Sequence, residues 1–273
     1  MPSRPSPTTA RTRTGALLAS VATLVSVGAL HPAPAAAASA PAPSPHATAA
    51  VLDLDGTGRT PVLHGQDSAY DTASIVKVDI LAALLLRAQD AGRQLTAEER
   101  GHAEPMIERS DNTAANALWR EIGQASGLAA ANKRLGLTST TGGPGVKWGL
   151  TRTTASDQIR LLRAVFDGDT TAKAGSATKS ALNAKSRTYI RSLMGKVIAE
   201  QSWGVSAAGG SGGAWALKNG WLQRNTTGLW DVNSVGQVTV KGHRYLVAVL
   251  SNGSASMSDG VSLVERTARA AVA

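Results

Sequence analysis

Residues 74–91 constrain the fold more than any other stretch of this chain, because they form a helical pattern with almost no polar face. Apolar side chains lie on every side of its first turns, namely Ile75, Val76, Val78, Ile80, Leu81, Leu84, Leu85 and Leu86. A helix of that kind is buried among other elements rather than laid on a surface. With 273 residues, the chain is long enough to build one large domain or two interleaved lobes around it.

Strand-like patterns lie at both ends of the chain. Residues 49–54 and 61–64 flank the turn sequence Asp55-Gly56-Thr57-Gly58, which predicts a hairpin. After a glycine-rich loop at 209–213, three more strands are expected, at about 214–222, 228–240 and 243–251.

Helical patterns fill the middle of the chain, at about 97–109, 112–122, 126–134, 154–167 and 187–199, and a last amphipathic helix is expected at about 258–271. We therefore predict an α+β fold, in which both chain ends form one antiparallel sheet covered by helices and the middle adds an all-helical lobe.

The amino terminus has the pattern of an export signal. Arg4, Arg11 and Arg13 give it a positive start, residues 15–30 are apolar and uncharged, and Ala36-Ala37-Ala38 offers small residues to a signal peptidase. The apolar run is shorter than the roughly 20 residues of a membrane span. We predict cleavage and secretion to the cell-wall side, with an uncleaved anchor as the alternative.

Three segments follow from this interpretation: a signal peptide at 1–38, an Ala/Pro-rich tether at 39–46 and one domain at 47–273. The chain has no cysteine, which excludes disulfides, thiolate catalysis and a lipid-modified cysteine. Without residues 1–38 the net charge falls from +9 to +6, since only three of 28 basic residues are lost and none of 19 acidic ones. The basic residues are dispersed, so we expect no nucleic-acid partner.

Ser74 and Lys77 stand three residues apart at the start of the apolar helix, so their side chains share one face, one turn apart. Burial and a second cation, such as Lys218, would favour a neutral Lys77 that can take a proton from a serine nucleophile. The alternative is that Ser74 only caps the helix and Lys77 extends to solvent. Ser176 and Lys179 repeat the spacing in a polar stretch, which we interpret as chance.

Ser110-Asp111-Asn112 precedes a helical pattern, so a capping turn is its simplest interpretation. A serine held on such a loop can also relay a proton, and an asparagine beside it can meet a substrate amide with both a donor and an acceptor.

Lys218-Asn219-Gly220-Trp221 follows the glycine-rich loop on a predicted strand. The glycine would let an extended substrate approach, the lysine would attract a carboxylate, and the backbone N–H groups of Trp221 and Ser74 could form an oxyanion hole. An ordinary edge strand with an Asn-Gly turn is the alternative.

Together these three motifs resemble those of penicillin-recognising serine enzymes, and specifically the class A β-lactamase family, over roughly residues 47–272. The resemblance implies Ser74 as nucleophile, Lys77 as its base, Ser110 as a proton relay, Asn112 as a substrate-amide contact and Lys218 as a carboxylate anchor. Asn219, Gly220 and Trp221 would complete the substrate-binding strand. Arg152-Thr153-Thr154 is similar to the end of the family's active-site loop.

Two departures from the family pattern limit what the resemblance implies. The family carries threonine or serine where this chain has Asn219, so an amide would replace a hydroxyl toward the substrate. The family's loop also carries a glutamate that activates the deacylating water, whereas residues 135–150 contain no acid. The resemblance therefore implies acylation with slow release.

The sequence thus predicts a secreted, monomeric serine hydrolase that acts on amide bonds of β-lactams or peptidoglycan-type peptides, without cofactor or metal. A D-alanyl-D-alanine carboxypeptidase-like enzyme and a non-catalytic penicillin- or cell-wall-binding protein remain alternatives. An α/β-hydrolase is disfavoured because Gly209-Gly210-Ser211-Gly212-Gly213 matches its serine motif only formally. The histidines are isolated, without metal-ligand spacing.

Overall fold

The computed structural model describes residues 44–57, 59–167, 180–210 and 212–273. These residues belong to one compact unit. The predicted signal peptide, most of the tether, the second serine–lysine pair and Ser211 lie outside the described residues.

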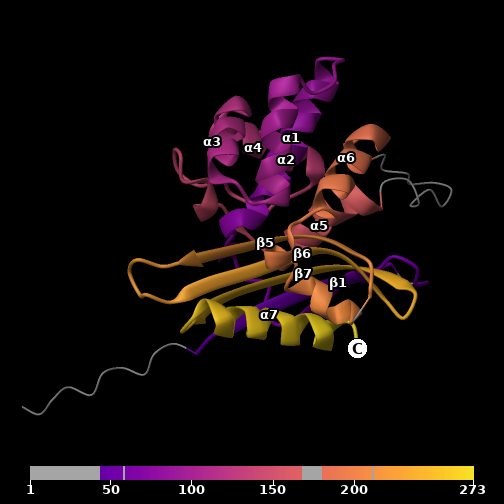
Figure 1. Ribbon diagram of the computed structural model, residues 1–273, viewed down its shortest axis with the longest axis vertical. Coiled ribbons are helices and arrows are strands. Elements are labelled where there is room, and N and C mark those ends of the chain that lie inside the picture. The colour runs from indigo at the N-terminus through magenta and orange to yellow at the C-terminus, as the bar shows by residue number, and fades with distance from the viewer. Residues whose placement is uncertain (1–43, 58, 168–179, 211) are drawn as a thin grey trace, which may run out of the picture. The chain divides into compact units, whose positions relative to one another are not determined.

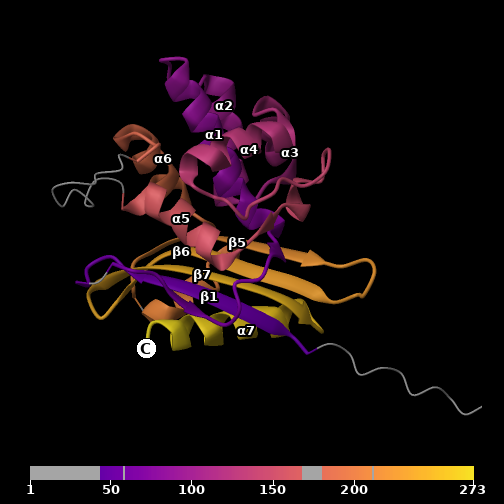
Figure 2. The ribbon, with the colours of Figure 1, turned by 180° about the vertical axis from the view of Figure 1, so that it is seen from behind.

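Both ends of this unit meet in one antiparallel sheet (Figures 1 and 2). The sheet has five strands in the order β2-β1-β7-β6-β5. Its strands are β1 (His46–Asp53), β2 (Val62–His64), β5 (Trp215–Gln223), β6 (Trp230–Val240) and β7 (His243–Ser254). The first strand pairs with β7 over its whole length, from His46 opposite Asn252 to Asp53 opposite Tyr245. The predicted sheet is confirmed, although β1 begins three residues before the predicted start.

Alternate residues of the strands face two separate cores, because side chains on a strand point to opposite faces in turn. In β1, Ala49 and Val51 pack toward one core, whereas Ala50 and Leu52 pack toward the other. Helix α7 (Met257–Ala271) covers the first face, and α5 (Ala155–Phe166) lies against the second (Figures 1 and 2). The sheet is therefore the middle layer of this unit.

The helical lobe surrounds α1 (Val76–Asp90), in which 12 residues are buried. This confirms the prediction of a helix enclosed on nearly every side. The other helices are α2 (Ala97–Glu108), α3 (Asn112–Glu121), α4 (Gln124–Leu135) and α6 (Ala184–Met194). The predicted helix at 187–199 was placed too late, because Asn183 caps α6 by accepting the N–H of Ser186.

Short elements connect the layers: β3 (Tyr70–Asp71), β4 (Arg152–Thr153), and the 3-10 turns η1 (Ala73–Ile75), η2 (Trp148–Leu150), η3 (Ala199–Gln201) and η4 (Val205–Gly209). Strands β3 and β4 pair with each other, which brings the loop ending at residue 152 beside the start of η1. In the described part of the chain, no helix has the length and apolar character needed to cross a membrane.

Candidate active site

Ser74 lies in η1, which continues directly into α1. The helix predicted to begin at Ser74 therefore starts as a 3-10 turn, and Ser74 and Lys77 share a continuous helical backbone. Ala73, just before the serine, has a φ of 46°, a left-handed conformation that is strained for alanine. Ser74 is half-buried.

Lys77 is fully buried at the junction of α1 and α3. Its Nζ donates to the Ser110 carbonyl oxygen at 2.7 Å, to Ser110 Oγ at 3.1 Å and to Asn112 Oδ1 at 2.8 Å. The alternative that Lys77 extends to solvent is thereby excluded, and the first two motifs form one cluster.

Burial lowers the pKa of Lys77 to about 7, against the opposing charge of Asp111. Taking a lysine side chain out of water disfavours its charged ammonium form relative to the neutral amine. A lysine with a pKa near 7 is about half neutral at neutral pH. Neutral Lys77 has a free lone pair, so it can accept a proton, and the Ser110 hydroxyl lies 3.1 Å from its Nζ.

Ser110 adopts a left-handed backbone with a φ of 58°. Its neighbour Asp111 is the residue that caps α3, by accepting the N–H of Ala114 at 2.7 Å. Because Asp111 takes the capping role, the Ser110 hydroxyl is left for the cluster of lysines.

Lys218 reaches this hydroxyl from β5. Its Nζ lies 2.9 Å from Ser110 Oγ and 2.9 Å from the carbonyl oxygen of Asn219. It is fully buried, so burial lowers its pKa well below the ordinary value, and the charge of Lys77 lowers it further. One serine hydroxyl thus bridges the amines of two buried lysines.

Gly220 lets β5 approach η1. A Cβ at this position would lie 2.6 Å from the Ser74 nitrogen, 2.7 Å from the Thr72 oxygen and 2.8 Å from the Ile75 nitrogen. Strand β5 is the last strand of the sheet, and η1 packs against the face of β5 from which the Cβ of residue 220 would project. Trp221 follows on the same strand, half-buried, with its ring centroid 5.9 Å from that of Trp203.

The structure does not support the expectation that the amide of Asn219 faces substrate. This side chain is fully buried, and its Nδ2 donates to the carbonyl oxygens of Gln201 at 2.9 Å and Trp203 at 2.8 Å. Alternate residues of a strand face opposite sides, so Asn219 points away from the lysine cluster and holds the segment at 201–203 against β5.

Sequence reasoning missed Asn233 on β6. Its Nδ2 donates to the carbonyl oxygens of Asp71 at 2.9 Å and Thr72 at 3.2 Å, while its Oδ1 accepts the N–H of Ser251. It fixes the chain just before Ser74, and no local pattern in the sequence marks it.

Trp148 was also missed. The centroid of its ring lies 4.7 Å from Lys77 Nζ, and its Nε1 donates to Asn116 Oδ1 at 2.8 Å. Trp119 holds the same loop by donating from its Nε1 to the Gly145 carbonyl oxygen at 2.7 Å. The acid-free loop therefore presents an aromatic face to Lys77. The sequence did offer one signal, since Trp148 is the only aromatic residue between 135 and 150.

A hydroxyl, a buried amine of lowered pKa and a second hydroxyl are groups that can serve as a nucleophile, a base and a proton relay. The arrangement of helices on an antiparallel sheet is that of serine hydrolases of the penicillin-binding and β-lactamase type. A sequence model described as the β-lactamase enzyme family matches residues 89–273, and the chain belongs to this family. Ser74 and Lys77 precede the matched residues.

Solved structures share the fold. A mutant of PBP-A, in an acyl-enzyme complex with penicillin G, has a TM-score of 0.67 and 23% identity, covering 83% of this chain and 89% of its own. A β-lactamase from Chitinophaga pinensis DSM 2588 has a TM-score of 0.67 and 16% identity, covering 84% of this chain and 94% of its own. At such identities the likeness shows the fold alone.

Curated relatives are similar over a shorter part of the chain. The putative lipoprotein LppW of Mycobacterium tuberculosis and of Mycobacterium bovis is 32% identical over 119 residues, which are 44% of this chain. The alignment spans 37% of the length of these relatives.

We predict that Gly220→Ala destabilises the protein by about 1–3 kcal/mol, because the added methyl overlaps backbone atoms and overpacking typically costs that much. Gly101→Ala on α2 is the matched control, since nothing lies within 4 Å of its added Cβ and alanine favours a helix. Urea denaturation of both variants gives the comparison. Parent-like stability of Gly220→Ala would contradict the close packing of β5 on η1.

Proposed function

We propose that this protein is an exported serine hydrolase that forms an acyl-enzyme on Ser74 with β-lactam or D-alanyl-type amide substrates. The observation that carries the proposal is the Ser110 hydroxyl, held 3.1 Å from Nζ of Lys77 and 2.9 Å from Nζ of Lys218. Lys77, which follows Ser74 by one helical turn, would act as the base for the nucleophile, and Ser110 would carry the proton to a leaving nitrogen.

In the first step, Ser74 Oγ bonds to the substrate carbonyl carbon while neutral Lys77 takes the hydroxyl proton. The backbone N–H groups of Ser74 and Trp221 stabilise the oxyanion. The C–N bond then breaks, and the nitrogen receives a proton from Ser110, which is reprotonated by Lys77. The products of this step are an ester on Ser74 and an amine.

Two further residues would orient the substrate. Asn112 uses its Oδ1 to accept from Lys77, which leaves its Nδ2 to donate to a substrate amide oxygen. A substrate carboxylate near Lys218 would favour the charged form of that amine and so bind to it. We place Gly220 and Trp221 along the substrate and assign Asn219 a supporting role.

Release of the ester is the slow step in this proposal. The loop at 135–150 lacks a carboxylate, and Trp148 covers Lys77 where a water-activating acid would have to act. Asp157 is not a substitute, since it is buried and accepts from the Ser139 N–H at 2.8 Å and the Thr140 hydroxyl at 2.7 Å. This favours a carboxypeptidase-like enzyme, trapped by β-lactams, over an efficient β-lactamase.

The proposed location is the cell envelope or the medium. The signal-like residues 1–38, the tether at 39–46 and the similarity to a putative lipoprotein support it. Because the chain has no cysteine to carry a lipid, we propose secretion rather than lipid anchoring. The proposed product is a monomeric domain at 47–273. Its small-molecule partners would be β-lactams or peptidoglycan-type peptides.

We predict that peptide mapping after reaction with a penicillin places the label on Ser74. Ser74→Ala should abolish labelling, and Lys77→Ala should slow it by about 10²–10⁴, as expected for loss of a positioned base. Lys133→Ala, which removes an exposed lysine of α4, should leave the rate unchanged. Label on another serine would refute the assignment, and no label at all would favour a non-catalytic binder.

A second prediction concerns release. The parent should hold a penicillin adduct for minutes, and Trp148→Glu should shorten its lifetime by about 100-fold or more, because a carboxylate can then activate water. The control Trp148→Phe keeps a ring beside Lys77 and loses only the bond to Asn116, so its adduct should persist. Intact-mass measurements give the lifetimes. Rapid hydrolysis of a chromogenic cephalosporin by the parent, without an adduct, would contradict slow release.

A further inference from the structure

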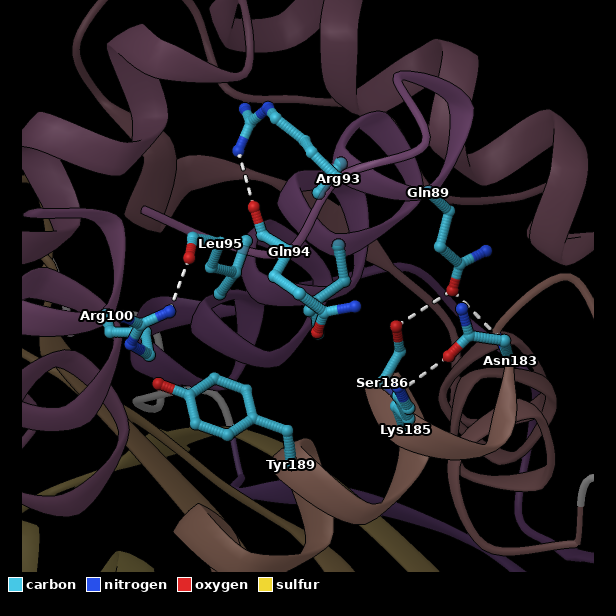
Figure 3. A pocket seen from close by; sticks show the side chains of 11 residues that line it. Gln89, Arg93, Gln94, Leu95, Arg100, Asn183, Lys185, Ser186 and Tyr189 are labelled. Atoms are coloured by element: carbon cyan, nitrogen blue, oxygen red, sulfur yellow. Dashed lines mark hydrogen bonds between the residues drawn. The ribbon is translucent and has the colours of Figure 1, made fainter. Parts of the chain in front are cut away.

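A cavity of about 240 Å³ lies near the carboxyl end of α1, the end opposite Ser74 (Figure 3). Its walls come from α1, from the segment that joins α1 to α2, and from the first turns of α2 and α6. Figure 3 shows Arg100 and Tyr189 on one side and Gln89, Asn183 and Ser186 on the other. This cavity is separate from the lysine cluster and plays no part in the proposed reaction.

The lining combines an apolar floor with positive charge. Leu85, Ala88 and Leu95 supply the floor. Three cationic side chains line the cavity, namely Arg93, Arg100 and Lys185, and no carboxylate does. The guanidinium of Arg93 is neutralised by Glu99, which does not line the cavity and whose carboxylate oxygens lie 2.7 and 2.8 Å from the Arg93 nitrogens. Arg100 and Lys185 form no ion pair within the described chain, so the lining itself carries a positive excess, while Glu104 and Glu108 place negative charge near Tyr189.

Tyr189 contributes a hydroxyl that is fully buried and has no hydrogen-bond partner among the described residues. Burial raises the pKa of this phenol to about 12, with Glu104 adding to the effect, so it remains an O–H donor. Buried polar groups are nearly always paired, which makes a free donor beside a cavity informative.

The other polar groups on the opposite wall are already engaged. Gln89 Oε1 accepts the N–H of Asn183 at 2.9 Å and the hydroxyl of Ser186 at 2.8 Å, and Asn183 caps α6. The groups left for a ligand are therefore the Tyr189 hydroxyl, the cations and the side-chain amide of Gln94, above an apolar floor.

We propose that this cavity binds a small organic carboxylate with an apolar body, of about the size of benzoate. The donors and cations would hold the carboxylate, and Leu85, Ala88 and Leu95 would contact the body. The volume lies below the roughly 300–1,000 Å³ of sites for drug-sized ligands, which limits the occupant to a small molecule. Inorganic phosphate has no apolar part that could contact Leu85, Ala88 and Leu95, so we expect it to bind more weakly.

Calorimetric titration of the protein with benzoate, benzamide and inorganic phosphate tests the proposal. Benzoate should bind saturably, with a Kd of about 1 mM or tighter, and benzamide and phosphate should bind at least about tenfold more weakly, since a hydrogen bond to a charged group is worth that factor. Tyr189→Phe and Lys185→Gln should each weaken benzoate about three- to tenfold. Lys196→Gln, an exposed lysine just beyond α6 that does not line the cavity, should bind like the parent.

The same titration on Ser74→Ala should give the parent's Kd, so this result stands or falls independently of the acylation chemistry. The proposal is overturned if benzoate shows no saturable binding, if benzamide or phosphate binds as tightly, or if Lys196→Gln weakens benzoate as much as Lys185→Gln does.

Discussion

The structure depends on the burial of two lysine amines against one serine hydroxyl. Lys77 comes from the helical lobe and Lys218 from the sheet, and both are fully buried. Burying an isolated ammonium costs free energy, so each amine must be paired with hydrogen-bond acceptors, and burial lowers its pKa. Ser110 provides the shared acceptor, which couples the packing of lobe on sheet to the chemistry of the site. Gly220 permits that contact, because a side chain there would separate β5 from η1.

Opposing effects set the state of Lys77. Burial lowers its pKa, whereas the charge of Asp111 raises it, and the face of Trp148 at 4.7 Å also favours the cation. A pKa near neutrality suits the proposed role of Lys77, which accepts a proton in one step and returns it in the next. The loop that carries Trp148 contains no acid between residues 135 and 150, which is the basis of the proposed slow release.

The sequence was sufficient for features with a local period or a strong local pattern. The apolar helix after Ser74, the strands at both ends and the proximity of Ser74 to Lys77 all follow from helical and strand spacing. Features that depend on contacts between residues distant in sequence could not be predicted. The inward turn of Asn219 depends on carbonyl groups at 201 and 203, the ring of Trp148 reaches Lys77 across 71 residues of chain, and β3 and β4 are too short to show alternation.

The most direct test of this account is an NMR titration of the protein carrying lysine labelled with ¹³C at the ε-carbon. One signal should titrate near pH 7 and vanish in Lys77→Arg, because burial holds the pKa of Lys77 at about 7 rather than 10.5. Lys77 would then be mostly charged below that midpoint and mostly neutral above it, and the rate of acylation should rise with pH through the same midpoint. If every lysine signal titrates near 10.5, Lys77 is not a neutral base and the central claim is wrong.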